Sequence, residues 1–139
     1  MPEKKKSEEK EISEIPESYQ RYLDVIYDIS KSKRGGWVSN KEIADNLNVE
    51  PASVSGMLEK LRKSDLIKWE PRRAIRLTDK GKIYAMQLNE IHELLRFFFN
   101  KVLKIGDRSV VEQVTCQIEH HITPEVKKSL EKFLSKYHD

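Results

Sequence analysis

The segment Cys116-Gln117-Ile118-Glu119-His120-His121 carries the side chains best suited to chemistry in this sequence. On a helix, the spacings i, i+3 and i+4 place the Cys116 thiol, the Glu119 carboxylate and the His120 imidazole on one face, where they can converge on a cation. Such a ligand set suits a first-row transition metal better than Ca²⁺ or Mg²⁺. These three residues can supply only part of a metal site, and His92 is the best candidate for a further ligand. The same pattern is also typical of a solvated face of a charged helix.

Composition limits the class of protein that can hold this cluster. The chain has 139 residues, of which 37% are hydrophobic and 35% charged. This predicts a soluble, helix-rich protein of one domain or two small ones. We expect a cytoplasmic protein without a membrane segment, because no apolar run is long enough to span a bilayer and the N-terminus is charged. The single cysteine excludes an internal disulfide and leaves a thiol available as a ligand.

The positive charge of the chain is concentrated in one stretch. The net charge is +3, but residues 60–82 hold nine Lys or Arg against three Asp or Glu, an excess of six. A local excess of this kind favours binding of phosphate groups, as in double-stranded DNA.

The first half of the chain predicts a helix-turn-helix. Residues 1–15 are mostly charged and are expected to be a disordered tail, and residues 17–33 have the spacing of an amphipathic helix. Ser39 and Glu42 form a capping box that opens a short helix over about 40–47. Pro51 is typical of the first position of a second helix, which is expected to run to about residue 64. Two short helices joined by such a turn are a helix-turn-helix.

Two β-prone runs follow, residues 66–69 and 74–77, around an arginine-rich turn. Their pattern predicts a hairpin, and therefore a winged helix-turn-helix DNA-binding domain over residues 16–78. The second helix of this domain exposes small residues that would let its backbone approach DNA closely. The residues expected to contact DNA are Lys41, Ala52, Ser53, Ser55, Gly56, Lys60, Arg72 and Arg73.

Residues 79–139 predict a helical second domain. A long helix to about residue 103 has apolar stripes wider than one small domain needs, which suggests a dimer interface, although a plain core helix fits the pattern equally well. Asp107 caps a helix over about 108–121, and Pro124 opens a last helix over about 124–137. The inward-facing residues of the last helix are expected to be Val126, Leu130, Phe133 and Leu134. The predicted fold is mainly α: an N-terminal winged helix-turn-helix, then a helical dimerisation and metal-binding domain.

Taken together, these features resemble the DtxR/MntR family of metal-dependent transcriptional repressors. The resemblance covers roughly residues 17–137, and its most specific parts are the stretches 18–23, 92–95 and 116–120. It implies a homodimer that binds a divalent metal between its first helix and its dimerisation helices. It also implies recognition helices that enter successive major grooves of a palindromic operator.

The resemblance also implies a set of metal ligands: Asp24, His92, Cys116, Glu119 and His120. Cysteine at position 116 is similar to the iron-type members, whereas Asp24 falls where manganese-type members carry an acidic ligand. The cofactor is therefore expected to be Mn²⁺ or Fe²⁺, with Zn²⁺, Co²⁺ or Ni²⁺ able to bind in vitro.

Arg21 departs from the family pattern, since it stands where the family places a ligand. A guanidinium cannot coordinate a metal and stays charged. Either Arg21 turns to solvent and leaves a one-metal site, or it pairs with Glu119 or Asp24 and replaces a cation. In the second case the dimer would be competent to bind DNA without metal.

Other positions depart as well. Arg96 and Glu112 replace residues that hold an ancillary metal in iron-type members, and we expect a salt bridge between them and at most one metal in that region. Gly56 stands where iron-type members present a glutamine to bases, so readout would depend on Ala52, Ser53 and Ser55 together with DNA shape. The sequence ends near Asp139, without the SH3-like domain of larger members.

The sequence thus predicts a metal-responsive repressor of the Mn/Fe type, and not an enzyme. The main alternative is a metal-independent or redox-sensing winged-helix regulator, in which Arg21 replaces a metal or the Cys116 thiol is oxidised. Two further alternatives are a metalloenzyme that uses a metal-bound water and an interaction module without DNA affinity.

Overall fold

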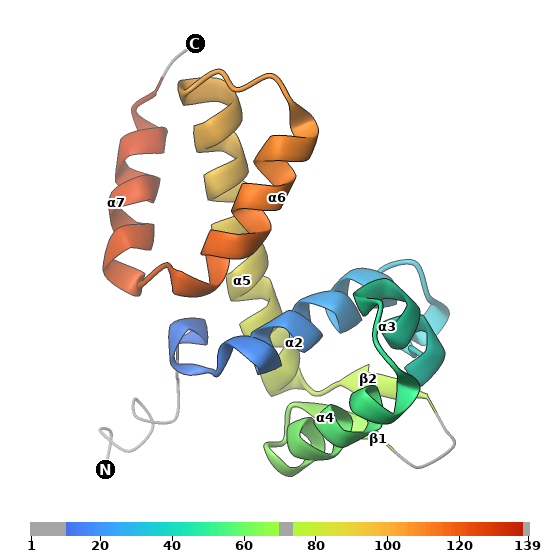
Figure 1. The fold of residues 1–139 in the computed structure, drawn as a ribbon. Helices are drawn as coiled ribbons and strands as arrows, with labels where there is room; N and C mark the ends of the chain where they lie inside the picture. Colours follow the sequence, from blue (N-terminus) through green and yellow to red (C-terminus); the bar gives the residue numbers. More distant parts are fainter. Residues whose placement is uncertain (1–10, 70–73, 138–139) are drawn as a thin grey trace, which may run out of the picture. The chain divides into compact units, whose positions relative to one another are not determined.

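The computed structural model describes residues 11–69 and 74–137 (Figure 1). The chain divides into two compact units, one of residues Pro16–Met86 and one of Met1–Ile15 with Gln87–Asp139. This division by contacts falls after Met86, inside helix α5 (Asp79–Phe97), whereas the domain boundary expected from the sequence follows residue 78. The expected boundary marked the start of this helix, and a continuous helix gives no signal at the residue where its neighbours change.

The Pro16–Met86 unit is a winged helix-turn-helix, as predicted. In chain order it contains α2 (Glu17–Ser30), the 3₁₀ turn η2 (Arg34–Gly36), α3 (Asn40–Leu47), α4 (Pro51–Lys63), β1 (Ile67–Trp69), β2 (Ile75–Leu77) and the start of α5. Strands β1 and β2 are antiparallel, with Lys68 opposite Arg76. Val38 adds a bridge to Ile75 through backbone hydrogen bonds of 2.8 and 2.6 Å.

Local sequence explains the position of α3 and α4. The Ser39 hydroxyl accepts from the Glu42 backbone N–H at 3.1 Å, and the Ser39 N–H donates to the Glu42 carboxylate at 3.0 Å, which is the predicted capping box. Asn48 ends α3 in the left-handed region, with φ of 56°, where asparagine is tolerated. Pro51 then takes the first position of α4. Asn48 at one end and Pro51 at the other therefore define the turn between α3 and α4.

Gly81 allows the first turn of α5 to pack against Leu66, the residue before β1. A Cβ atom at this position would lie 2.1 Å from the Leu66 carbonyl oxygen, so a larger residue would push the two apart. Thr78 caps the helix here: its hydroxyl accepts from the Gly81 N–H at 3.0 Å and donates to the Asp65 carbonyl at 2.7 Å. The wing is thus fixed to the start of α5.

The second unit contains the rest of α5, the π-helical turn η3 (Phe98–Val102), α6 (Arg108–Ile118), the 3₁₀ turn η4 (Glu119–His121) and α7 (Pro124–Ser135). Asp107 and Thr123 cap α6 and α7, as predicted. The helix expected to reach residue 121 ends at Ile118 and tightens into η4. The last turn of a helix often becomes 3₁₀, and Thr123 is extended because it precedes a proline.

Part of the segment expected to be a disordered tail is ordered. Residues 1–10 lie outside the described residues, but Ile12–Glu14 form the 3₁₀ turn η1. Ile12 is 3% exposed, and its N–H donates to the Gln87 side-chain oxygen at 2.9 Å. Its apolar side chain gains enough from burial to order a short stretch of an otherwise charged segment.

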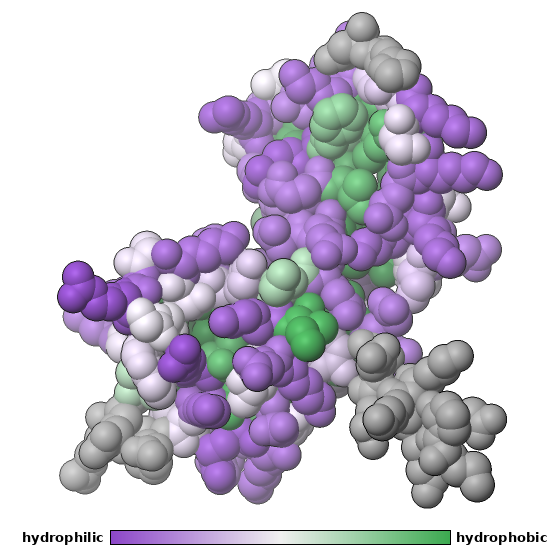
Figure 2. Space-filling view, turned by 180° about the vertical axis from the view of Figure 1, so that it is seen from behind, coloured by the Kyte–Doolittle hydropathy of each residue, from purple (hydrophilic) through white to green (hydrophobic). Residues whose placement is uncertain are grey.

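Helix α7 differs from the prediction that its apolar residues face inward. Val126 is 44% exposed and Phe133 51% exposed, and no α7 residue is buried. Figure 2 shows apolar surface open to solvent on this unit. Among residues 11–69 and 74–137, therefore, nothing in a single copy of the chain buries these apolar side chains of α7. None of the helices in the described part of the chain combines the length and apolar composition that a bilayer crossing requires.

Candidate metal centre and DNA-binding surface

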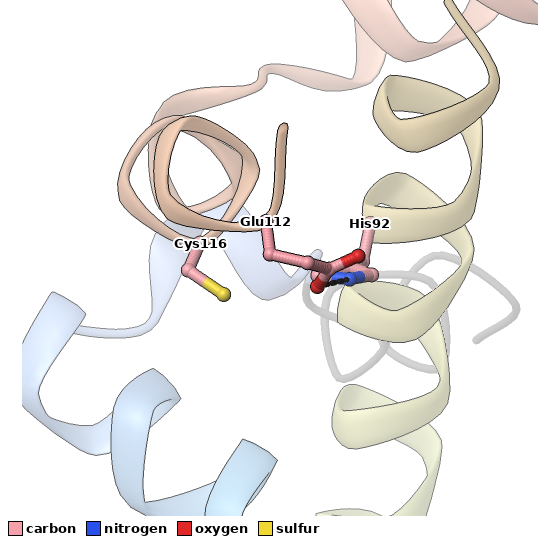
Figure 3. A group of neighbouring side chains, drawn as sticks. All are labelled: His92, Glu112 and Cys116. Atoms are coloured by element: carbon pink, nitrogen blue, oxygen red, sulfur yellow. Dashed lines mark ion pairs between the residues drawn. The ribbon is translucent and has the colours of Figure 1, made fainter. Parts of the chain in front are cut away.

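The cluster predicted to bind metal lies in the second unit. His92 projects from α5, and Glu112 and Cys116 lie one turn apart on α6 and point toward it (Figure 3). One ligand atom from each of these three residues lies within 4.8 Å of the other two. Glu119 and His120 follow on η4 and are buried. The fold therefore brings residues from three elements to one place.

Glu119 lies between the two histidines. Its Oε2 is 2.6 Å from His92 Nδ1, and its Oε1 is 3.7 Å from His120 Nε2. The Glu119 side chain is 1% exposed, and a carboxylate this deeply buried needs polar partners of this kind. The hydrogen bond to Glu119 raises the pKa of His92 above its ordinary value; partial burial opposes this, and the charges of Glu119 and Glu112 add to it.

Arg96 completes the network. Its Nε donates to Glu112 Oε1 at 2.7 Å, its Nη2 is 2.9 Å from His92 Nε2, and its Nη1 is 3.0 Å from Glu93 Oε1. The second oxygen of Glu112 lies 3.2 Å from His92 Nε2. Partial burial would raise the pKa of Glu112, but the hydrogen bond and charge of Arg96, with a smaller contribution from His92, hold it below the ordinary value. The expected pair of Arg96 and Glu112 is thus present in the structure.

The donor set fits a divalent transition metal. It offers an imidazole nitrogen, carboxylate oxygens and a thiol, and Cys116 is exposed and forms no disulfide. Ligands bind such ions at roughly 2.0–2.3 Å, so ligand atoms within 4.8 Å of one another need only a small contraction to share an ion. Glu112, which the sequence assigned to the salt bridge, belongs to this group of three.

Arg21 and Asp24 belong to the Pro16–Met86 unit, where both lie on α2. The Arg21 guanidinium pairs with Glu17, four residues earlier on the same helix, at 2.7 Å. Both side chains are substantially exposed. The pairing shows that Arg21 has a partner within its own unit. The roles of Arg21 and Asp24 toward a metal stay predictions.

The described residues that are expected to contact DNA lie on α3 and α4. Lys41, Ala52, Ser53, Gly56 and Lys60 are exposed. Nothing approaches within 4 Å of a Cβ placed on Gly56, so the surface there is open. Ser55 is half-buried: its hydroxyl donates to the Pro51 carbonyl at 3.2 Å and receives a hydrogen bond from the Asn40 amide at 3.0 Å. Arg72 and Arg73 lie outside the described residues.

Sequence reasoning missed the contact between Arg96 and His92. The two are four residues apart on α5, and residues at this spacing are neighbours on a helix surface. Glu112 and Cys116 have the same spacing on α6, which identifies Glu112 as a further candidate ligand. Both signals are readable in the sequence once the helices are assigned.

A winged helix-turn-helix followed by a helical unit with a nitrogen, oxygen and sulfur cluster defines a class of metal-linked DNA-binding proteins. Two family models match the chain: "Iron dependent repressor, N-terminal DNA binding domain" over residues 5–75, and "Iron dependent repressor, metal binding and dimerisation domain" over residues 78–139. The chain belongs to the iron-dependent repressor family, which the sequence resemblance named as DtxR/MntR.

Curated relatives agree with this assignment. The HTH-type transcriptional regulator MntR of Shouchella clausii is 38% identical over 106 residues, covering 76% of this chain and 71% of that protein. The MntR of Bacillus subtilis is 33% identical, with 76% and 72% covered. An uncharacterized HTH-type transcriptional regulator of Methanocaldococcus jannaschii is 28% identical over 125 residues, covering 90% of this chain and 98% of that protein.

Solved structures have the same fold. The manganese regulator SloR has a TM-score of 0.70 at 28% identity, and the metal-dependent transcriptional regulator MtsR has 0.74 at 26%. These matches cover 86% and 84% of this chain, but the chain spans about half the length of each, 54% and 53%.

Proposed function

We propose that this protein is a metal-responsive transcriptional repressor that binds a palindromic operator as a homodimer. One observation carries the proposal: the cluster of His92, Glu112, Cys116 and Glu119 lies in the unit that matches a metal-binding and dimerisation domain, in a chain that also holds a winged helix-turn-helix. The curated relative is named as a transcriptional regulator, and two proteins of known structure are named as a manganese regulator and a manganese-dependent transcriptional repressor. The proposal includes a repressor role in the cytoplasm and no enzymatic activity.

The ligands proposed from the sequence are Asp24, His92, Cys116, Glu119 and His120, with Mn²⁺ or Fe²⁺ as the metal, and the structure adds Glu112 as a further candidate. A bound divalent ion would supply positive charge among these donors and so stabilise one arrangement of the repressor. Glu119 orients His92 through its Nδ1, which leaves Nε2 directed to the other donors. We also propose that the Arg96–Glu112 pair replaces an ancillary metal.

The proposed dimer uses the second unit. This unit exposes large apolar side chains that a single copy leaves in water, and a self-complementary contact between two copies would cover them. The residues concerned are Phe97, Leu103, Val110, Val126 and Phe133.

On the DNA side, the exposed small residues Ala52, Ser53 and Gly56 would let the backbone of α4 approach the major groove. Ser55 contributes mainly to the turn, because its hydroxyl already donates to Pro51. Lys41 and Lys60, together with the wing arginines, would contact phosphates and make binding dependent on salt.

The test is a titration of DNA binding with metal. Duplexes enriched from random double-stranded DNA by the Mn²⁺-loaded protein are labelled, and binding is followed by fluorescence anisotropy with Mn²⁺, Fe²⁺, Zn²⁺, Co²⁺ or excess chelator. We expect metal to tighten binding and His120→Ala to reduce the metal response by roughly ten- to a hundredfold in metal concentration. Equal affinity with metal and with chelator would reject the proposal.

The second candidate is a metal-independent, redox-sensing regulator. It is favoured by the exposed Cys116 thiol and by a cluster whose charges Arg96 already pairs without a metal. Oxidation that changes DNA affinity in wild type but not in Cys116→Ser, while metals have no effect, would establish it.

A further inference from the structure

The Arg96 guanidinium contacts the same atoms of His92 and Glu112 that would coordinate a metal. Its Nε donates to Glu112 Oε1 at 2.7 Å, and its Nη2 is 2.9 Å from His92 Nε2. We propose that Arg96 is an internal cation that competes with the metal for His92 and Glu112 and so sets the metal concentration at which the site fills. This inference rests on the proposed function and goes beyond the salt bridge as a substitute for an ancillary ion.

The competition follows from the chemistry of His92. Its Nδ1 is 2.6 Å from Glu119 Oε2, so a neutral ring donates its proton there and carries its lone pair on Nε2. That lone pair can accept a hydrogen bond from Arg96 or bind a metal, but it cannot do both. Metal binding through Nε2 therefore requires Arg96 to leave.

Glu112 adds a second point of competition. One of its oxygens is engaged by Arg96, and the other lies 3.2 Å from His92 Nε2. A divalent ion at this position would also repel the guanidinium. Glu93 offers the displaced group a place to go, since its exposed carboxylate already holds Arg96 Nη1 at 3.0 Å. Arg96 can thus turn outward without losing every partner.

The cost of displacing Arg96 is the same whichever ion enters. Arg96 therefore lowers the affinity for all divalent metals by a common factor and leaves their order unchanged. This distinguishes a competitor from a residue that shapes the coordination geometry, because a change of geometry would affect Mn²⁺ and Zn²⁺ differently.

The experiment compares the full-length protein with Arg96→Met and Arg108→Met by isothermal titration with MnCl₂ and with ZnCl₂. Arg108 is an exposed arginine that lines the same pocket as Arg96 and Glu112, so its variant removes an equal charge nearby. We expect Arg96→Met to bind both metals about fivefold more tightly at unchanged stoichiometry, as suits loss of a partly exposed charged hydrogen bond. Arg108→Met should bind as wild type does.

A measurement on the wild type guards against misfolding of the variant. The Arg96 Nε–H signal in ¹⁵N NMR should exchange slowly with water in the chelated protein and lose this protection when Zn²⁺ is added. Unchanged affinity in Arg96→Met, equal gains in both variants, a second bound ion per subunit, or a protected Nε–H in the zinc form would each overturn the inference. If neither wild type nor the variants bind Mn²⁺ or Zn²⁺, the proposed function fails as well.

Discussion

The two units differ in what they bury. Among the described residues, the Pro16–Met86 unit has fourteen buried apolar residues and one buried polar residue, Gln20. The second unit has five buried apolar residues, and it buries three polar ones, Thr115, Glu119 and His120. A closed apolar core stabilises a fold by itself, whereas buried polar groups stabilise it when their partners are in place.

The surfaces differ less than the cores. Both units leave large apolar side chains more than two-fifths exposed, among them Ile83 and Met86 in the Pro16–Met86 unit and Phe97 and Phe133 in the second unit, which has the smaller core. The DNA-binding unit therefore has the larger apolar core of the two, supplied by one copy of the chain. For the second unit we propose that binding adds stability, through a second copy on its exposed apolar side chains and a cation among its acidic groups. A unit stabilised in this way can act as a switch.

The largest expected effect is that of Leu58→Ala in the DNA-binding unit. Leu58 is fully buried on α4, and truncation to alanine leaves a cavity in the closed core. We expect the free energy of unfolding to fall by about 2–5 kcal/mol. Urea denaturation followed by circular dichroism measures this, and the loss should not depend on protein concentration. A concentration-dependent loss would mean that this unit is not self-sufficient.

Phe133→Ala should act through assembly instead. Phe133 is 51% exposed and contacts Phe98 and Tyr137 with ring centroids 6.3 Å apart, so it offers an aromatic surface to a partner copy. We expect the dimer dissociation constant to rise about tenfold or more, measured by sedimentation equilibrium. Trp37→Ala is the matched control, since Trp37 is 44% exposed in the other unit and its loss should leave dimerisation unchanged. Equal effects would place the interface elsewhere.

The sequence predicted most of the fold because its signals are local. Ser39 with Glu42, and Asp107, satisfy backbone groups at a helix start, and Pro51 lacks the N–H that would have no partner at the first position of a helix. The structure confirms each of these starts. The burial of Ile12 could not be predicted, because one apolar residue in a charged segment has no periodicity. The exposure of α7 was also missed, since an amphipathic pattern does not say whether its apolar face meets the same chain or another.

The site was only partly readable. Cys116, Glu119 and His120 attract attention by their types and spacing, but His92 is 27 residues from Glu119, and no local rule brings them together. The resemblance to a known family supplied that link. Arg96 was assigned to Glu112 correctly as a contact, yet its hydrogen bond to His92 depends on side-chain rotamers that the sequence does not specify.

Two titratable groups, His92 in the second unit and Glu42 in the first, should make stability depend on pH in opposite directions in the chelated protein. The pKa of His92 is raised, chiefly by its hydrogen bond to Glu119, so its contribution to stability is fully present below the unfolded value of 6.5. This contribution is lost as the pH rises through the folded pKa. The pKa of Glu42 is lowered by hydrogen bonds from Lys33 and the Ser39 backbone. Its contribution is therefore lost as the pH falls below 4.5.

Urea denaturation in excess chelator, repeated from acid to mildly alkaline pH, measures the free energy of unfolding across this range. Its fall toward low pH is the acid limb, and its fall toward high pH is the alkaline limb. His92→Gln should flatten the alkaline limb and leave the acid limb in place, while Glu42→Gln should flatten part of the acid limb. Glu112, whose pKa is also lowered, keeps a share of the acid limb in the second unit. An alkaline limb that survives in His92→Gln would assign it to another group.

The smallest expected effect, Gly56→Ala, separates stability from DNA binding within the Pro16–Met86 unit. Gly56 lies inside α4 with open space around it, so a methyl group meets no atom and lowers the conformational freedom of the unfolded chain. We expect the free energy of unfolding to rise by about 0.5–1 kcal/mol. If α4 approaches the bases as closely as its small residues allow, the same methyl group weakens DNA binding, measured by anisotropy. A protein that is more stable and binds DNA unchanged would show that this part of α4 stays clear of the groove, and would move readout toward Ser53 and the wing.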